Sequence, residues 1–136
     1  MFSPELRILD VSLNRLREAL RVMEDYARFA LDDADAAAAI KRLRHEAREI
    51  AEVIGVEELM AARDIVGDVG RDERASAELL RGAARDVAGA AIGRAQEAAR
   101  GICEYSKTVA PQAAERAERI RHAVYELEQR LLLRGA

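Results

Sequence analysis

The chain has 136 residues, of which 50% are hydrophobic, and a formal net charge of −3 at pH 7. This length is typical of one domain, and the balance of charge argues against a nucleic-acid-binding protein, in which a basic excess is expected. Aromatic residues make up only 4% of the chain and there are two prolines, which favours closely packed helices over a β-sandwich. We therefore expect a single all-helical domain over residues 1–136.

The start of the chain, MFSPELR, has neither the basic nor the apolar region of a signal peptide. No apolar run approaches the length of a membrane span. The lone cysteine, Cys103, excludes an intrachain disulfide framework. We expect a cytoplasmic protein with no membrane partner.

The first helix is expected to begin at Ser3 and Pro4, an N-cap followed by an N1 proline, and to run to about Ala30. Its apolar residues follow the spacing of a bundle seam: Leu9, Leu13, Leu16, Leu20, Met23 and Ala27. The opposite side carries four polar residues, here called the polar ladder: Asn14, Glu18, Arg21 and Asp25. Large apolar groups at Val11, Val22 and Phe29 share that side, so the ladder is predicted to face a cleft, a second subunit or both.

The rest of the chain is expected to complete a first helical hairpin and to form a second one. The acidic turn at residues 32–35 should start a second helix at about Ala34–Ile54, antiparallel to the first and ended by Gly55, so that the first hairpin spans about residues 4–54. A short helix at about Glu57–Ala62 and a polar loop, Arg63–Glu73, should occupy the connection at residues 55–72. A long helix from about Asp72 or Ser76 to Thr108, and a last one from Pro111 to about Leu133, should form the second hairpin at about residues 73–134.

An internal repeat relates the two hairpins. The segment GRAQEAARGICEYSK at residues 93–107 aligns without gaps on NRLREALRVMEDYAR at residues 14–28, an offset of 79 residues. Residues 43–45, Leu-Arg-His, recur as Ile-Arg-His at residues 120–122, an offset of 77 residues. The repeat predicts a helical bundle of two related hairpins with pseudo-twofold internal symmetry.

Arginine is the residue type expected to recognise anions in this chain, which has only two lysines, Lys41 and Lys107. A guanidinium binds phosphate oxygens as a planar fork and stays charged. The candidates are Arg15, Arg21, Arg63, Arg94 and Arg100. Ion pairs along the first helix, Glu18 with Arg21 and Arg21 with Asp25, are an alternative explanation for part of this set.

Two aspartates flank Gly67 in the polar loop. Asp64 and Asp68, together with Glu18 or Asp25, are candidate ligands of Mg²⁺, which prefers oxygen. The alternative is that the two loop aspartates cap turns. His45 and His122 each follow an arginine, and both a structural role and a substrate-binding role remain open for them.

Several ordered segments closely resemble one family. They are RILDVSLNRLREALRVMEDYARFALDD, IKRLRHE, AARDIVGDVG, RAQEAARGICEYSK and ERIRHAVYELEQ, which together reach from about Arg7 to Glu128. The family is the helical domain found at the N-terminus of some bacterial thiamine phosphate synthases, and also free-standing as a hydroxymethylpyrimidine phosphate kinase. The resemblance implies an enzyme that uses ATP and Mg²⁺ to convert hydroxymethylpyrimidine phosphate into its diphosphate, with thiamine phosphate synthase as a functional partner.

For the residues that match the family pattern, we form a hypothesis about individual roles. The catalytic set would be Arg21, Arg63 and Asp64, and the metal ligands Asp64, Asp68, Glu18 and Asp25. Substrate and phosphate binding would fall to Asn14, Arg15, Arg44, His45, Arg94, Arg100 and Lys107. Two positions of the second hairpin depart from the family pattern, Gly93 in place of asparagine and Cys103 in place of an acid, which bears on whether both hairpins supply a complete site.

Two other functions compete with a kinase. A non-catalytic domain that docks onto thiamine phosphate synthase through the polar ladder would co-purify with the synthase and would not turn over ATP. A nucleotide pyrophosphohydrolase would need a denser cluster of acids on facing helices than this chain provides. The apolar groups beside the ladder also predict a homodimer.

Overall fold

The computed structural model describes residues 3–74 and 79–134. Within them the chain forms α1 (Pro4–Asp25), the π-helical turn η1 (Tyr26–Ala30), α2 (Ala34–Ile54), α3 (Val56–Ala61), α4 (Ala84–Ser106) and α5 (Pro111–Arg134), and no strands. The all-helical prediction is confirmed. In this described part, no helix is long and apolar enough to cross a membrane.

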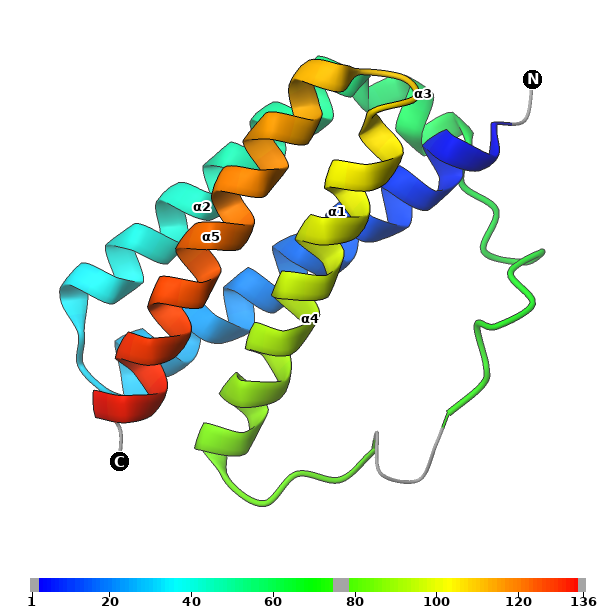
Figure 1. Ribbon diagram of the computed structural model, residues 1–136. Helices are drawn as coiled ribbons and strands as arrows, with labels where there is room; N and C mark the ends of the chain where they lie inside the picture. Colours follow the sequence, from blue (N-terminus) through cyan, green and yellow to red (C-terminus); the bar gives the residue numbers. More distant parts are fainter. Residues whose placement is uncertain (1–2, 75–78, 135–136) are drawn as a thin grey trace.

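The four long helices form a bundle of two antiparallel hairpins (Figure 1). The hairpin of α1 and α2 packs on the hairpin of α4 and α5, with α1 beside α4 and α2 beside α5. The connection between α3 and α4 leaves the bundle near the start of α1 and returns at the opposite end (Figure 1). The helical bundle is as predicted, and the twofold relation between the hairpins stays a prediction.

The start and the core stripe of α1 follow the predicted pattern. Ser3 caps the helix, since its Oγ accepts the backbone N–H of Leu6 at 3.2 Å, and Pro4 is the first helical residue. All six stripe residues are buried: Leu9, Leu13, Leu16, Leu20, Met23 and Ala27. Each large apolar side chain removed from water contributes about 1.5–3 kcal/mol, so this stripe is a main source of bundle stability.

The turn between α1 and α2 is tied to the far end of α5. The backbone N–H of Leu31 bonds to the carbonyl of Tyr26 at 3.1 Å, which closes the wide π-helical turn. Asp33 then caps α2 by accepting the N–H of Ala36 at 3.0 Å. The same carboxylate binds Nε and Nη2 of Arg130, both at 2.8 Å. One acid, whose side chain is 7% exposed, therefore fixes a helix start and an interhelical contact.

The long helix of the second hairpin begins later than the sequence predicts. It starts at Ala84, where Asp86 Oδ2 accepts the backbone N–H of Ala83 at 2.9 Å, whereas the expected start was Asp72 or Ser76. Asp72 lies in a turn, and Ser76 lies outside the described residues. Residues 63–74 and 79–83 are exposed, so no core packing supports a helix there, and short helices are marginal without it.

Candidate functional site

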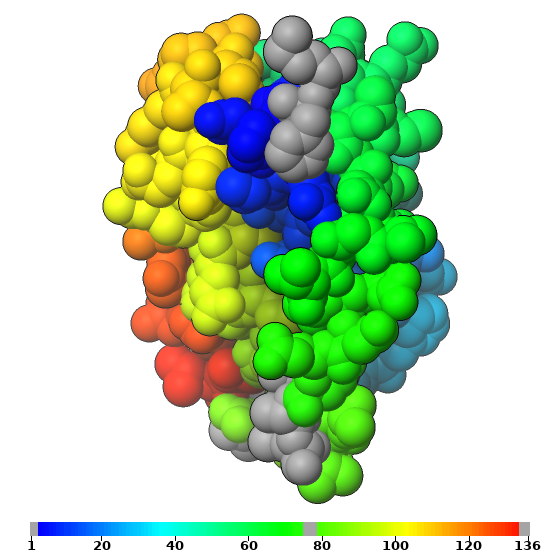
Figure 2. Space-filling model, turned by 90° about the vertical axis from the view of Figure 1, so that its right-hand side faces the viewer, coloured from blue at the N-terminus to red at the C-terminus, as the bar shows by residue number. Residues whose placement is uncertain are grey.

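Two cavities adjoin the polar side of α1. The α1–α2 cavity has a volume of about 350 Å³ and is lined by Asn14, Arg17, Glu18, Arg21, Arg44, His45 and Arg48. The α1–loop cavity, about 380 Å³, is lined by Arg7, Ile8, Val11, Ser12, Arg15, Arg63, Asp64, Ile65, Gly67, Asp68 and Val69. The α1 residues that line the two cavities lie on neighbouring faces of this helix, because successive residues are rotated by about 100° about the helix axis. Figure 2 shows the connection lying alongside the start of α1.

One arginine that lines the α1–α2 cavity, Arg44, is held in place by an ion pair. Arg44 of α2 donates its Nε to Glu24 Oε1 of α1 at 2.7 Å, and the Glu24 side chain is only 10% exposed. This ion pair joins the two helices and fixes the plane of the Arg44 guanidinium. The other Arg44 nitrogens are therefore held close to the cavity that this residue lines.

Three more arginines of this cavity lack neutralising partners. In residues 3–74 and 79–134, no carboxylate forms an ion pair with Arg17, Arg21 or Arg48. The alternative pairs expected along the first helix, Glu18 with Arg21 and Arg21 with Asp25, are therefore not formed in this part of the chain. A concave surface with uncompensated guanidinium groups attracts anions, and phosphates in particular.

The α1–loop cavity depends on a contact that anchors the loop to α1. Arg63 donates Nε and Nη2 to the two carboxylate oxygens of Asp10, each at 2.8 Å, and the Asp10 side chain is 7% exposed. The hydrogen bond and the charge of Asp10 raise the pKa of Arg63 above its usual value. Arg7 adds a second anchor by donating Nη2 to the backbone carbonyl of Asp64 at 2.9 Å. The beginning of the loop is thus held against the helix.

Asp64 and Asp68 both line the α1–loop cavity and both shape the loop. Asp64 Oδ1 accepts the backbone N–H of Gly67 at 2.8 Å, and Asp68 Oδ1 accepts that of Gly70 at 2.9 Å. The turn-capping role is confirmed. In each carboxylate, Oδ2 takes no part in these hydrogen bonds.

The four predicted metal ligands do not line one cavity. Glu18 lines the α1–α2 cavity, and Asp25 lines a third cavity beside η1. Among the described residues, no group of three or more histidine, cysteine or acidic side chains is arranged to hold a metal. A Mg²⁺ ion at Asp64 and Asp68 would take its other ligands from phosphate and water, as Mg²⁺ commonly does.

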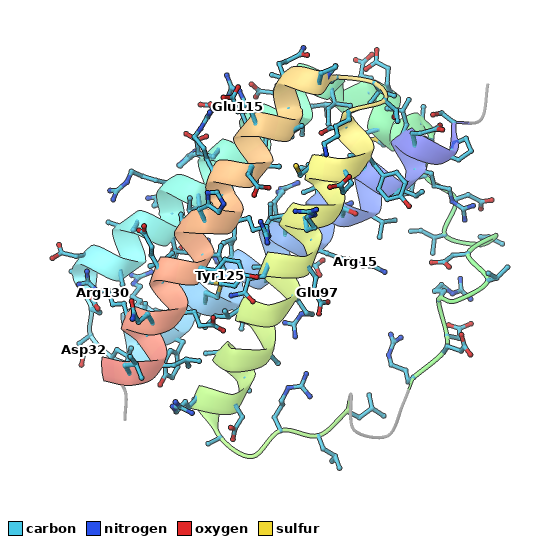
Figure 3. The ribbon with its side chains drawn as sticks, viewed as in Figure 1. Arg15, Asp32, Glu97, Glu115, Tyr125 and Arg130 are labelled. Atoms are coloured by element: carbon cyan, nitrogen blue, oxygen red, sulfur yellow. The ribbon has the colours of Figure 1, made fainter. Side chains whose placement is uncertain are left out.

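The predicted residues of α4 stand apart from both cavities. Arg100 and Lys107 both pair with the exposed carboxylate of Glu104, at 3.1 and 3.2 Å, and Arg94 is exposed. The helix α4 itself packs beside α1, and Figure 3 labels one residue of each, Arg15 and Glu97. The candidates of the second hairpin nevertheless line neither cavity, whereas the first-hairpin and loop candidates other than Asp25 line one or other of the two.

The sequence interpretation missed three arginines that line the cavities, Arg7, Arg17 and Arg48, and also Asp10, which anchors Arg63. A signal existed for two of them. Arg17 precedes Arg21 by four residues and Arg48 follows Arg44 by four, and like charges at this helical spacing repel each other. Such pairs on facing helices predict a shared anionic partner.

In the second hairpin, Cys103, which aligns with Glu24 in the repeat, interacts with Glu118. Burial raises the pKa of the Cys103 thiol, and the hydrogen bond with Glu118 raises it further. Burial opposes ionisation of Glu118, but the hydrogen bond with Cys103 and the charges of Arg121 and His122 outweigh it and lower the Glu118 pKa. Arg121 Nη1 and His122 Nε2 lie 2.7 and 3.1 Å from Glu118 Oε1. These contacts are internal to the hairpin.

Comparison with known proteins gives one consistent result. Residues 7–130 match the model of the ThiD2 family. The chain is 40% identical over 126 residues to the thiamine-phosphate synthase of Nostoc punctiforme, which covers 93% of this chain and 35% of that protein. It is 38% identical over 126 residues to the thiamine-phosphate synthase of Synechocystis sp., with 93% and 36% covered. For the thiamine-phosphate synthase of Rhodopirellula baltica, the identity is 36% over 131 residues, with 96% and 35% covered.

The chain spans about a third of the length of these curated relatives. No solved structure matches it.

Proposed function

Because the chain belongs to the ThiD2 family, we propose that it transfers the γ-phosphoryl group of ATP to hydroxymethylpyrimidine phosphate. The product is the pyrimidine diphosphate, and the reaction is a step of thiamine biosynthesis. The relatives' name, thiamine-phosphate synthase, supports the connection with thiamine.

One observation carries the proposal: candidates from distant parts of the chain meet around the polar side of α1, in two cavities of different character. The α1–α2 cavity is rich in arginine and suits phosphate. The α1–loop cavity combines two aspartates with apolar walls from Ile8, Val11 and Val69. Apolar walls suit a flat aromatic ring, and two carboxylates suit Mg²⁺ bound to phosphates.

The chemistry makes modest demands on the protein. An oxygen of the substrate phosphate forms a bond to the γ-phosphorus, and the bond from that phosphorus to the bridging oxygen of ADP breaks. A phosphate monoester is mostly a dianion at pH 7, so no side chain has to remove a proton from the nucleophile. Catalysis then rests on positioning and on neutralising charge, which arginines supply. Bound at Asp64 and Asp68, Mg²⁺ would neutralise further phosphate charge.

The direct test is ADP release by the purified chain with ATP, Mg²⁺ and hydroxymethylpyrimidine phosphate, with the unphosphorylated alcohol run in parallel. We expect turnover with the phosphate. Asp68→Asn should lower kcat at least about tenfold, because one charge-assisted metal contact is lost. Asp35→Asn, an exposed acid at the start of α2, is the matched control and should behave as wild type. Absence of ADP release would refute the proposal.

A second candidate, a non-catalytic docking domain, is favoured by an apolar surface near η1. A cavity of about 500 Å³ there is lined by Val22, Asp25, Tyr26, Phe29, Ala30, Ala84, Val87 and Ala88, and Phe29 is 67% exposed. The candidate predicts that thiamine phosphate synthase co-purifies with the chain and that Phe29→Ser abolishes the association. The predicted homodimer could use the same surface. Light scattering across a range of protein concentrations measures the molecular mass, and a constant monomer mass would exclude the homodimer.

A further inference from the structure

The repeat allows each residue of the α1–α2 cavity to be compared with its counterpart in the second hairpin. At the offsets of 79 and 77 residues, Arg21, Arg44 and His45 recur as Arg100, Arg121 and His122. Arg17 and Arg48 do not recur. Their counterparts are Gln96 and Tyr125.

In the second hairpin, Gln96, Arg121 and Tyr125 make contacts with other residues of the protein. Gln96 Nε2 donates to Glu128 Oε1 at 3.1 Å. Arg121 pairs with Glu118 and lies over the ring of Tyr125, with 5.4 Å between the guanidinium carbon and the ring centre. Tyr125, labelled in Figure 3, therefore covers an arginine at the position where α2 has Arg48.

A single change of charge accounts for part of this difference. The counterpart of Glu118 in α2 is Lys41, so the first hairpin has no acid at this position to neutralise Arg44. Arg44 pairs across the helices with Glu24 instead, and the counterpart of Glu24 is Cys103. The two hairpins have thus diverged in opposite directions: one keeps cationic groups around a cavity and the other neutralises them.

The charge of the α1–α2 cavity matches a particular ligand. Four guanidinium groups face two carboxylates, Glu18 in the lining and Glu24 behind Arg44, which leaves a surplus of two positive charges. A phosphate monoester carries about −1.5 to −2 at pH 7. We propose that this cavity binds the phosphate group of a phosphate monoester, that Arg17 and Arg48 are its specificity-determining residues, and that the second hairpin has no equivalent site.

This assignment rests on the proposed function only in naming the ligand as the pyrimidine phosphate. The test therefore measures binding and not turnover. Isothermal titration calorimetry is carried out with hydroxymethylpyrimidine phosphate, with inorganic phosphate and with the unphosphorylated alcohol, in the absence of ATP and Mg²⁺. We expect the wild-type chain to bind the two phosphates and to discriminate strongly against the alcohol.

The test substitutions give the first hairpin the residues of the second. Arg17→Gln and Arg48→Tyr should each weaken binding of both phosphates by about ten- to hundredfold, the loss expected for one charge-assisted contact, and should leave binding of the alcohol unchanged. Both arginines are exposed, so the core is not altered. Arg42→Gln is the matched control, since it removes the same charge from another face of α2 and should bind as wild type.

Thermal unfolding followed by circular dichroism verifies that all variants are folded. If Arg42→Gln weakened binding as much as Arg48→Tyr, the effect would be one of overall charge and the proposal would be wrong. Unchanged phosphate binding in both Arg17→Gln and Arg48→Tyr would also overturn it. Phosphate binding that is lost in these variants, in a chain that releases no ADP, would support this site and refute the kinase.

Discussion

Replacing Asp10 with asparagine is the most direct test of how the polar loop is held. The substitution preserves shape but removes the charge and one acceptor of the paired hydrogen bonds to Arg63. A hydrogen bond to a charged group contributes about 1.5–3 kcal/mol. Arg63 is 39% exposed, so water screens part of the attraction, and the released loop regains conformational entropy. We expect Asp10→Asn to lower the free energy of unfolding by about 1–2 kcal/mol.

The measurement is urea unfolding followed by far-ultraviolet circular dichroism, for Asp10→Asn, Arg63→Gln and the double variant. If the two side chains act as a pair, the double variant should be about as stable as either single one, which corresponds to a coupling energy of about 1 kcal/mol or more. Stability losses that add to within about 0.3–0.5 kcal/mol would show that the pair contributes nothing.

The same variants separate two roles of Arg63 in the proposed reaction. If Arg63 only positions the loop, Asp10→Asn and Arg63→Gln should lower kcat by the same factor, because each releases the same anchor. If Arg63 also touches a phosphate, Arg63→Gln should lower kcat by about tenfold more. A normal kcat in both variants would mean that the anchor has no part in the reaction.

Three further predictions concern other parts of the bundle. Gly55→Ala should cost about 1–2 kcal/mol in urea unfolding, because Gly55 has a φ of 121° that disfavours any side chain, and an unchanged midpoint would contradict this. Cys103 should react with iodoacetamide at pH 8 more slowly than free cysteine, because its pKa is raised and its thiolate is scarce, and Glu118→Gln should speed the reaction. If Cys103 reacted with iodoacetamide as fast as free cysteine does, its pKa would not be raised and the prediction would be wrong. Asp33→Ala should cost about 2–3 kcal/mol, since it removes both the α2 cap and the contact with Arg130, and additivity with Arg130→Gln would argue against that contact.

Much of the bundle could be predicted because its signals are local. The core stripe of α1 is a spacing of three and four residues, and the caps at Ser3 and Asp33 are side chains that bond to backbone only three residues away. The bounds of α2 follow from such signals and agree with the prediction. Local sequence patterns do not predict a helix boundary that depends on tertiary packing. The long helix was expected to begin at Asp72 or Ser76, but residues 72–74 and 79–83 are exposed and have no core to support a helix.

The candidate site was predictable only in part for the same reason. Asn14, Glu18 and Arg21 were found because they share one side of a helix, and the structure places all three on the α1–α2 cavity. Asp10 was missed because its partner, Arg63, lies 53 residues away in the chain. No spacing rule connects two residues that only the fold brings together.

The position of the candidate site on α1 would let this helix serve both stability and the proposed function. Its buried stripe packs against the bundle, while its polar side faces the two cavities, so a ligand bound there contacts a backbone that the core holds in place. The acids that orient Arg44 and Arg63, Glu24 and Asp10, lie between these two sides and are nearly buried. Each acid is thus shielded from water on its own side, while its arginine stays partly exposed, at 24% for Arg44 and 39% for Arg63. At the repeat counterpart of Glu24 the chain has Cys103, which cannot form such an ion pair with Arg121, and this difference supports the proposal that only the first hairpin binds a phosphate.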